Sequence, residues 1–575
     1  MAIENPTFNL KTGADSDLII SREVTESGST KGKIKRTDKL FRFPSLVRRT
    51  GDTITGTTEN IESSELKHGR TKSAPRKGTS SSSGDINFEF SPETFDDMLE
   101  AVLRGEWTRF KSDTNSPSNK DGLVYTDGFF ATKCATGDTA KAGKRLIYVG
   151  PDTENPNNEG LVHVANNGKG FVVHELNSGT YDVKYSILRK YGGQKNEDLW
   201  QEFCHCALNT LQLSVEINSI ITGSFGVMGT NNPKIYDDKE VSYELESRLA
   251  SVTDADSLAK KGDWAASTEY AVNDVVYETS GKKWYKCTTA HTSGTAFAGD
   301  SANWTEFESH EFINAIPEKA TDTMQFTARE GFLYVNGRKI QYAQSLSLSL
   351  DNGLTPKYAI FVPNAISVPP LTLDITGDLS TYLVNDENGS KELFNDAIAD
   401  ETIELMFCFQ DKLEDPTALY LFQIFKAKNT ENSVNGNGED TFDVSLPWSS
   451  FDEQAMRVFR IMLPRAVEMK AAVATDGDTP VTSGNPNMLL LRPNVELEAD
   501  DVDASDFTIT WLVDGKETAV TVSSVTLETK ETESDYGLVE VAFTPITQTD
   551  AEQVVTAIVK WHDEECVGTF TVPAA

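Results

Sequence analysis

Short runs in which apolar and polar residues alternate, separated by Gly, Asn and Asp, fill most of this 575-residue chain. A period of two places successive side chains on opposite faces of a strand, so such runs are typical of half-buried β-strands. Residues 86–90, Ile-Asn-Phe-Glu-Phe, are an example. Few segments beyond 91–104, 196–207 and 390–400 have helical spacing. The pattern predicts a mainly β fold with short helices.

The clearest helix is expected over residues 91–104. Ser91 is a suitable N-cap, Pro92 suits the first helical position, and Gly105 would end the helix. Apolar residues recur on one face at three- and four-residue spacing, namely Phe95, Met98, Leu99 and Val102.

The chain is strongly acidic. It has 53 Lys and Arg against 88 Asp and Glu, a net charge of −35. Such a chain should not grip phosphate backbones non-specifically, although a surface that DNA merely passes is compatible with it. Residues 1–80 hold 15 basic and 10 acidic residues, whereas residues 471–575 hold 4 and 20. The two ends either help to orient self-association or are simply solvated surfaces.

Motifs of known catalytic sites are missing from the sequence. It has no G-x-S-x-G elbow, P-loop, H-E-x-x-H or C-x-x-C pair. Cys204, His205 and Cys206 are potential metal ligands, but three consecutive residues cannot all turn to one tetrahedral ion, which favours a structural role. We therefore predict no enzyme, no cofactor and no metal site.

The sequence also bears on where the chain is made. Its first residues lack the basic and apolar regions of a signal peptide, and no apolar run approaches the roughly 20 residues that span a bilayer. Six cysteines are too few for a disulfide scaffold. We expect a chain made in a reducing cytosol, without membrane insertion.

A strand, a long loop, a second strand and a short helix occur twice along the chain. The first set covers residues 61–66, 84–90 and 94–103, and the second covers 343–354, 371–379 and 391–399. Identity between the sets is weak, so the pattern indicates either a duplication or a habit common to β-rich sequences.

Residues 256–310 are unusually rich in Trp and Tyr. The spacing of their aromatic residues resembles that of small carbohydrate-binding modules of families five and twelve, which bind chitin and cellulose. The resemblance implies a three-stranded insert whose aromatic rings stack on sugar rings. A domain this small also needs its rings for its own core, so glycan binding and a purely decorative fold both remain open. The predicted carbohydrate-binding residues are Trp264, Tyr277, Trp284 and Tyr285.

The C-terminal residues 469–575 form a separate all-β segment after a stretch that contains Pro and Gly. Phe507-Thr-Ile-Thr-Trp511 is an alternating strand with a Trp, and a tight Asp-Gly turn follows. The array of strands resembles a bacterial immunoglobulin-like domain, a β-sandwich, which by itself implies no function.

The remaining motifs resemble tail tube proteins of long-tailed, siphovirus-type bacteriophages. The resemblance covers roughly residues 40–465, interrupted by the aromatic insert. It rests on Ile61-Glu-Ser-Ser-Glu-Leu, on Thr94 to Trp107, on Leu211 to Gly229, and on Ser345-Leu-Ser-Leu-Ser-Leu-Asp351. It implies duplicated β-sandwich or barrel domains. The expected domains are an N-terminal arm (1–36), a first tail tube domain (37–255), the insert (256–310), a second tail tube domain (311–468) and the immunoglobulin-like domain (469–575).

The resemblance also implies a function. The chain would be a structural virion protein of the tail, synthesised in the host cytoplasm, whose rings stack into a tube that delivers DNA to the host. Two tube domains per chain imply rings of three chains with pseudo-six-fold symmetry, and a spurious repeat would imply six chains. Further partners would be the tape measure protein, terminator and tip proteins, passing DNA without sequence recognition, and host-surface glycans.

We expect contacts between rings to involve the N-terminal arm and a loop over residues 66–84. The basic residues of that loop are Lys67, Arg70, Lys72, Arg76 and Lys77. We also expect a net-negative bore, since short-range repulsion keeps DNA sliding. The alternatives are a polysaccharide-degrading enzyme with a sugar-binding module, which requires paired carboxylates in a cleft, and an adhesin or tail fibre, which requires elongated repeats.

Overall fold

The computed structural model describes most of the chain, and the structural statements below concern these residues. They are 16–24, 33–35, 45–64, 73–109, 123–124, 144–148, 161–165, 172–192, 198–237, 249–250, 259–280, 283–306, 323–336, 338–385, 390–399, 401–412, 416–436, 441–451, 456–473, 485–495, 497, 502–513, 516–528, 538–561 and 564–574.

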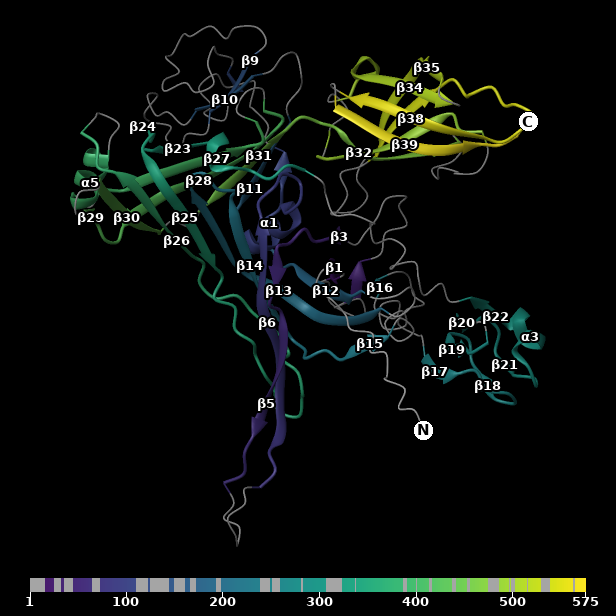
Figure 1. Ribbon diagram of the computed structural model, residues 1–575. Coiled ribbons are helices and arrows are strands. Elements are labelled where there is room, and N and C mark those ends of the chain that lie inside the picture. Colours follow the sequence, from purple (N-terminus) through teal and green to yellow (C-terminus); the bar gives the residue numbers. More distant parts are fainter. Residues whose placement is uncertain are drawn as a thin grey trace, which may run out of the picture.

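The body is a mainly antiparallel system of 22 connected strands, confirming the predicted mainly β class (Figure 1). Its first half contains β1 (Ser16–Val24), β2 (Lys33–Lys35), β3 (Ser45–Leu46), β4 (Gly51–Asp52), β5 (Thr55–Ile61), β6 (Arg76–Glu89), α1 (Asp96–Leu103), β7 (Thr108–Arg109), β11 (Val172–Asn177), β12 (Lys184–Tyr191), β13 (Leu199–Glu216), β14 (Thr222–Gly229), β15 (Ile235–Asp237) and β16 (Leu249–Ala250). A small separate sheet contains β8 (Leu123–Val124), β9 (Lys144–Tyr148) and β10 (Leu161–Ala165).

The second half of the body contains the 3₁₀-helix η4 (Ala328–Glu330), β23 (Gly331–Val335), β24 (Arg338–Lys339), β25 (Ala343–Asp351), β26 (Asp374–Tyr382), α5 (Ser390–Ile398), β27 (Ile403–Gln410), β28 (Ala418–Asn429), β29 (Ser433–Gly436), β30 (Phe442–Ser450) and β31 (Arg457–Met462).

The two halves repeat one topology. The order β1, β5, β6, α1, β12, β13, β14 in the first copy corresponds to β23, β25, β26, α5, β27, β28, β30 in the second. The pairings correspond as well: β1–β12 with β23–β27, β12–β13 with β27–β28, β5–β6 with β25–β26, and β6–β14 with β26–β30. This agreement favours a duplication over a shared compositional habit.

One continuous apolar core serves both copies. Phe88 and Phe225, on paired strands of the first copy, stack with ring centroids 4.8 Å apart. Phe90 lies against Phe409 and Phe422 of the second copy with edge-to-face geometry, which is favourable for aromatic rings. The two copies therefore pack as a single unit.

The helix predicted over residues 91–104 starts later than expected. α1 begins at Asp96, Phe95 occupies the cap position, and no side chain caps the helix. The Ser91 hydroxyl bonds to that of Thr94 at 2.9 Å instead of to the helix. Glu93 has a left-handed φ of 65°, so the backbone cannot be helical at this position. The helix therefore starts only after Glu93, and its start is determined by tertiary contacts.

Gly105 does not end α1 either. Arg104 is the C-cap, with a left-handed φ of 57°. Gly105 is needed for a different reason, because a Cβ built on it would lie 2.1 Å from the carbonyl oxygen of Asn177.

The helix predicted over residues 196–207 is wrong, since this stretch begins the long strand β13. Phe203 and Cys206 are buried at a spacing of three, which mimics a helix. The spacing arises from a register shift in the β12–β13 ladder, where His205 has a φ of 52°. The extra residue of this bulge turns a period of two into a period of three.

The loop predicted over residues 66–84 is wrong in its last part, because Arg76 to Gly84 lie inside β6. Their Ser-rich composition suggests flexibility, but two neighbouring strands supply backbone partners. Ser83 is opposite Thr55 of β5 and Met228 of β14. Ladder hydrogen bonds on both sides outweigh weak strand propensity here.

Residues 259–306 form a small module with more strands than the three expected. One sheet joins β17 (Ala259–Asp263), β19 (Asp274–Glu278), β20 (Lys283–Cys287) and β22 (Trp304–Glu306), and a second joins β18 (Glu269–Tyr270) and β21 (His291–Thr292). The short helices α3 (Phe297–Asp300) and η3 (Ser301–Asn303) precede β22.

The C-terminal segment is a β-sandwich of two four-stranded sheets. One sheet contains β32 (Ala466–Ala472), β33 (Met488–Pro493), β37 (Leu538–Phe543) and β36 (Val522–Glu528). The other contains β35 (Lys516–Val520), β34 (Phe507–Val513), β38 (Gln553–Trp561) and β39 (Glu564–Val572), with η6 (Ala504–Asp506) before β34. Trp511 and Trp561 are buried between the sheets.

Candidate functional site: sheet edges, polar face and strand ends

The two copies meet through a strand pair inside the chain. The C-terminal half of β13 pairs with β14 on one side and with β25 of the second copy on the other. In this junction Gln212 is opposite Ser349, and Leu213 is opposite Leu348. The junction buries Leu213, which is only 3% exposed.

The equivalent strand of the second copy is β28 continued by β29. Leu213 is opposite Gly223 of β14, and Val434 of β29 is opposite Val444 of β30, the counterpart of β14. Val434 therefore occupies the position of Leu213, yet it is 41% exposed. Among the described residues, β29 pairs with β30 alone.

The strand β5 is the counterpart of β25 and forms the other edge. Within the described parts of the chain its only partner is β6. Thr53, Thr55 and Thr57 are exposed there, and Ile54 between them is buried. Unpaired N–H and C=O groups on an edge strand are a template for pairing with another chain.

One face of the main sheet, here called the polar face, is lined by the residues that alternate with buried apolar ones. It takes in residues 81–89 of β6, 210–216 of β13, 443–449 of β30, and all of β14, β25 and β26. Asn87, Gln212 and Ser347 line one shallow depression on it. Its alternating positions hold no Lys or Arg, and their carboxylates are Asp85, Glu89, Glu216, Asp351, Asp374, Asp378 and Asp443.

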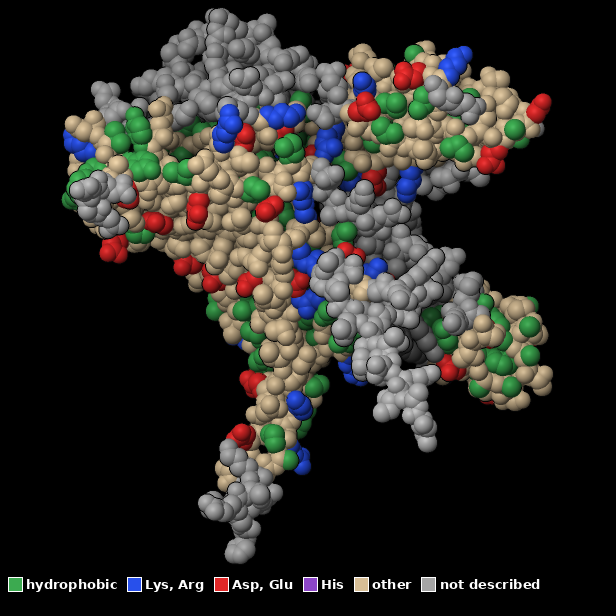
Figure 2. Space-filling view, viewed as in Figure 1, with side chains coloured by type: hydrophobic (Ala, Val, Ile, Leu, Met, Phe, Trp, Pro, Cys, Tyr) green, Lys and Arg blue, Asp and Glu red, His purple; other side chains and the backbone are tan. Residues whose placement is uncertain are grey.

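The acidic side chains of the body can be followed in Figure 2, where they are scattered between α5 and the β5–β6 hairpin. The polar face therefore presents small hydroxyl and amide groups with negative charge and without a cation at those positions. Such a surface repels polyphosphate at short range and offers it no cationic partner at those positions.

Two of the five basic residues predicted for ring contacts lie in the described part of the chain. Arg76 and Lys77 are exposed at the start of β6, opposite Ile61 and Asn60 of β5. In Figure 1 this hairpin extends well beyond the other strands of the body. Lys67, Arg70 and Lys72 lie outside the described residues.

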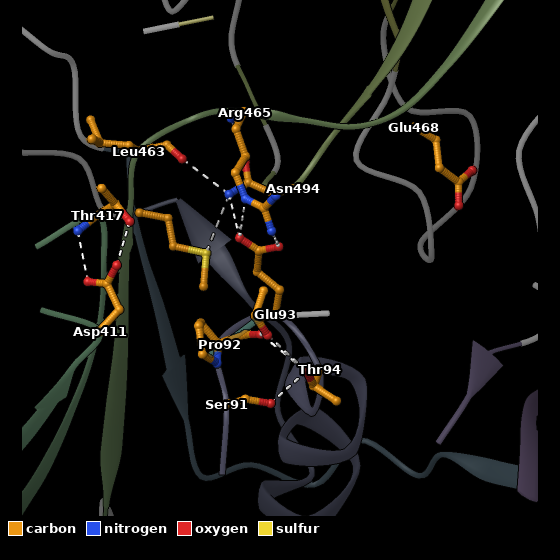
Figure 3. A network of polar contacts seen from close by, with 12 residues as sticks. Ser91, Pro92, Glu93, Thr94, Asp411, Thr417, Leu463, Arg465, Glu468 and Asn494 are labelled. Carbon is orange, nitrogen blue, oxygen red and sulfur yellow. Dashed lines mark hydrogen bonds and ion pairs between the residues drawn. The ribbon is translucent and has the colours of Figure 1, made fainter. Parts of the chain in front are cut away.

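The C-terminal sandwich is attached to the body by a polar network at the start of α1 (Figure 3). Arg465 donates to both carboxylate oxygens of Glu93, from Nε at 3.1 Å and from Nη2 at 2.5 Å. Asn494 donates to Glu93 at 2.8 Å and to the Leu463 carbonyl oxygen at 3.1 Å. Bidentate, charge-assisted contacts of this kind fix orientation.

A second set of ionic contacts holds α1 itself. The buried Arg460 of β31 pairs with Asp96 at 2.6 Å. Arg22 of β1 pairs with Asp97 and with Glu100. Burial raises the pKa of Glu100, and the Arg22 charge opposes this shift. α1 is therefore fixed to strands of both copies.

The four predicted carbohydrate-binding residues all lie in the module of residues 259–306. Trp284 is buried and packs against Val275 and Tyr277. Tyr277, Trp264 and Tyr285 are half-buried, and Trp264 and Tyr285 both lie against Phe297. These rings thus contribute to the core of the module, and their sugar binding remains a prediction.

The Cys204-His205-Cys206 sequence lies at the bulge of β13. The His205 backbone N–H donates to Glu23 at 3.0 Å, and its ring is bonded to the same carboxylate. Cys206 is buried. No group of three or more His, Cys, Asp and Glu suited to a metal ion occurs among the described residues. In those residues, too, no helix has the length and apolar character needed to cross a membrane.

Within the described residues, the duplicated β body has paired inner strands and unpaired outer edges, and unpaired edges are templates for pairing with another chain. A family model described as phage tail tube protein matches residues 13–271 and 289–450, more than half of the chain. The chain belongs to this family, and its role in the phage tail is a structural one. No curated protein gives a significant match.

The family match confirms the tail tube resemblance and refines its limits. It begins at residue 13, so it includes β1, and it ends at residue 450, before the C-terminal sandwich. The unmatched residues 272–288 lie within the segment 256–310 that was predicted as an insert. Sequence reasoning missed the open edges and the polar face. The signal for the polar face was present in the alternating Ser345-Leu-Ser-Leu-Ser-Leu-Asp351.

Proposed function

We propose that three chains close a ring through the edges β29 and β5, and that such rings stack into the tail tube through which DNA is delivered. The supporting observation is the difference between Leu213 and Val434. Leu213 is covered by β25 inside the chain, and its counterpart Val434 is left exposed beside an edge that has no strand partner among the described residues. The next chain supplies β5, the counterpart of β25.

The internal junction also gives the register of the proposed contact. Ser433 is the counterpart of Gln212, and Thr55 is the counterpart of Ser349. Because Gln212 is opposite Ser349, Ser433 is expected opposite Thr55 of the neighbouring chain. The antiparallel ladder then runs on to Asp52 opposite Gly436.

Three chains contribute six copies of the repeat, which gives the ring pseudo-six-fold symmetry. Each copy contributes to one sheet, and closing this sheet removes its open edges. The polar face then lines the bore. Its carboxylates keep DNA from adhering, as does the absence of Lys and Arg from its alternating positions.

A double-cysteine chain tests the ring. Ser433→Cys and Thr55→Cys place two cysteines opposite each other across the proposed contact. Their Cα atoms would be about 4.5–5.5 Å apart, which is within disulfide reach. Mild oxidation should convert rings seen by electron microscopy into covalent species that end at three chains. In the matched control, Ser433→Cys with Glu59→Cys, the second thiol is about 13 Å further along β5 and should not link.

The proposal fails if both pairs link equally, or if the covalent series ends at six chains. The unmodified chain, oxidised in parallel, gives the background from its own cysteines, of which Cys204 and Cys566 are partly exposed.

The proposed tail tube implies further protein partners. We propose that the tape measure protein occupies the bore during assembly, and that terminator and tip proteins meet the end rings. The predicted N-terminal arm (1–36) is corrected for residues 16–24, which form β1 in the body sheet opposite β12. We propose that the rest of the arm and the basic residues Lys67, Arg70, Lys72, Arg76 and Lys77 contact acidic groups of an adjacent ring. The chain would be made in the host cytoplasm and would function in the virion.

For the module of residues 259–306 we propose binding to host-surface glycans through the half-buried Trp264, Tyr277 and Tyr285. This rests on the sequence resemblance, with Trp284 in a supporting position in the core. Retention of assembled tubes on insoluble polysaccharide should fall for Tyr277→Ala. Equal retention of the Tyr277→Ala and unmodified tubes would mean that the module does not bind glycans through this residue.

A further inference from the structure

The segment between β25 and β26 carries an exposed apolar tip. Ile360 is 83% exposed and Phe361 is 99% exposed, and Val362 follows them. Phe361 also has a left-handed φ of 68°, an unfavourable conformation for a bulky side chain. Consecutive exposed apolar residues of this kind mark an interaction site.

This tip, residues 360–362, is held in place by hydrogen bonds at its base. The Ser80 N–H of β6 donates to the Pro363 carbonyl oxygen at 2.8 Å, and the Ala365 N–H donates back to the Ser80 carbonyl oxygen at 2.9 Å. Lys357 and Ser367 pair across the segment. The tip is therefore pre-organised, which lowers the entropy that binding must remove.

A cavity of the body lies at the opposite end of β25. Its volume is about 480 Å³, and it opens where β13 ends and β25 begins. Apolar residues of both copies line it, namely Val215, Ile217, Phe332, Leu333, Ile340 and Leu346. Ile217 at its mouth is exposed.

The tip and the cavity face opposite directions along the strands. β25 runs from Ala343 beside the cavity to Asp351, where the tip segment starts. Figure 1 shows this segment running down beside the β5–β6 hairpin, away from β23 and β27. Lateral pairing of β29 with β5 is perpendicular to the strands, so the strand ends face the neighbouring rings.

We propose that the tip residues 360–362 insert into the cavity of a second copy of this chain in the adjacent ring. This inference rests on the proposed rings and names the contact that stacks them. Because tip and cavity are different surfaces at opposite ends of one subunit, the contact is heterologous and does not close, so it repeats along an open stack. Val215, Phe332 and Leu333 form part of the cavity lining and offer apolar contacts to the two exposed side chains, while Glu216 and Arg329 also line it.

Two substitutions test the two sides of this contact. Phe361→Asp places a charge on the tip, and Ile217→Asp places one at the mouth of the cavity, both at exposed positions that a folded chain tolerates. The matched control is Val554→Asp, which changes another exposed apolar residue, on the C-terminal sandwich. By electron microscopy, both test variants should give single rings and at least a tenfold loss of tubes, and the control should give normal tubes.

Mixing the two variants sharpens the test. Rings of the Phe361→Asp chain keep an intact cavity, and rings of the Ile217→Asp chain keep an intact tip. The mixture should therefore give pairs of rings that cannot grow further.

Normal tubes from either variant would overturn the proposal. Loss of rings as well as tubes, with the control intact, would place these residues in the lateral contact and would also overturn it. Pairs missing from the mixture would show that tip and cavity do not meet each other. A failure of the unmodified chain to form rings would instead refute the proposed function.

Discussion

The two copies of the repeat differ mainly in what covers them. In the first copy, β13 is covered by β25 of the same chain, and Leu213 is buried. In the second copy, β29 has the same place in the topology, and Val434 remains exposed. One junction inside the chain thus serves as a template for the contact that the other copy must make with a neighbour.

The largest effect is expected from a substitution that breaks the internal junction. Leu213→Asp places an unpaired charge in the core and should destabilise the chain by about 5 kcal/mol or more, adding a lost apolar contact to a buried charge. Val434→Asp, at the equivalent position, should leave the thermal unfolding of the isolated chain nearly unchanged and abolish rings. Circular dichroism and electron microscopy measure the two effects.

Comparing Leu213→Asp with Val434→Asp tests whether β29 is an open edge. Val434→Thr, which has a similar shape and no charge, is the matched control. If Val434→Asp unfolds the chain as Leu213→Asp does, β29 is covered within the subunit. If Val434→Asp forms normal rings, the two strands are not equivalent in function.

An intermediate effect is expected on the polar face, where both copies contribute carboxylates. Replacing Asp374 and Asp378 of the second copy with Lys should leave tubes intact and slow DNA ejection from virions several-fold, because lysines pair with phosphates. Asp85→Lys with Glu89→Lys in the first copy should behave alike. The delay should shrink at high salt, since the Debye length falls from about 10 Å at 0.1 M to about 3 Å at 1 M.

Unchanged ejection in both double variants would mean that the polar face is not the bore. A delay from only one copy would mean that the two copies do not line it equally.

The sequence was sufficient for the parts of the fold that depend on local pattern. Alternation predicted many strands, and the order of elements indicated the repeat, but its first strand was predicted at residues 61–66, whereas β5 spans Thr55–Ile61. It failed where tertiary contacts override composition, as in Thr79 to Gly84, whose serines form a strand between two partners. It also failed at the bulge of β13, where His205 changes the period.

The sites were harder to predict than the strands. Nothing in Ser433-Val-Asn-Gly436 marks an open edge until its counterpart in β13 is known. Glu93 and Arg465 form a bidentate contact across 372 positions of sequence, and single residues of such pairs carry no local signal. The sequence carries no signal for the tip at Phe361, because exposure, and not residue type, distinguishes it.

The smallest expected effect distinguishes two loops. One joins β5 to β6 in the first copy, and the other joins β25 to β26 in the second copy. The loop of the second copy carries the apolar tip, and the hairpin of the first copy begins its return strand with the exposed Arg76 and Lys77. Apolar contacts are insensitive to moderate salt, whereas exposed ion pairs are screened and contribute about 0.2–1 kcal/mol each. Arg76→Gln with Lys77→Gln should therefore lower the melting temperature of the tubes by a few degrees at 50 mM salt and by less at 500 mM.

Light scattering during heating measures this melting temperature. The control, Lys516→Gln with Lys560→Gln on the C-terminal sandwich, removes the same charge. A loss that persists at high salt would mean that Arg76 and Lys77 act through packing and not through charge, and it would contradict the proposed ionic contact.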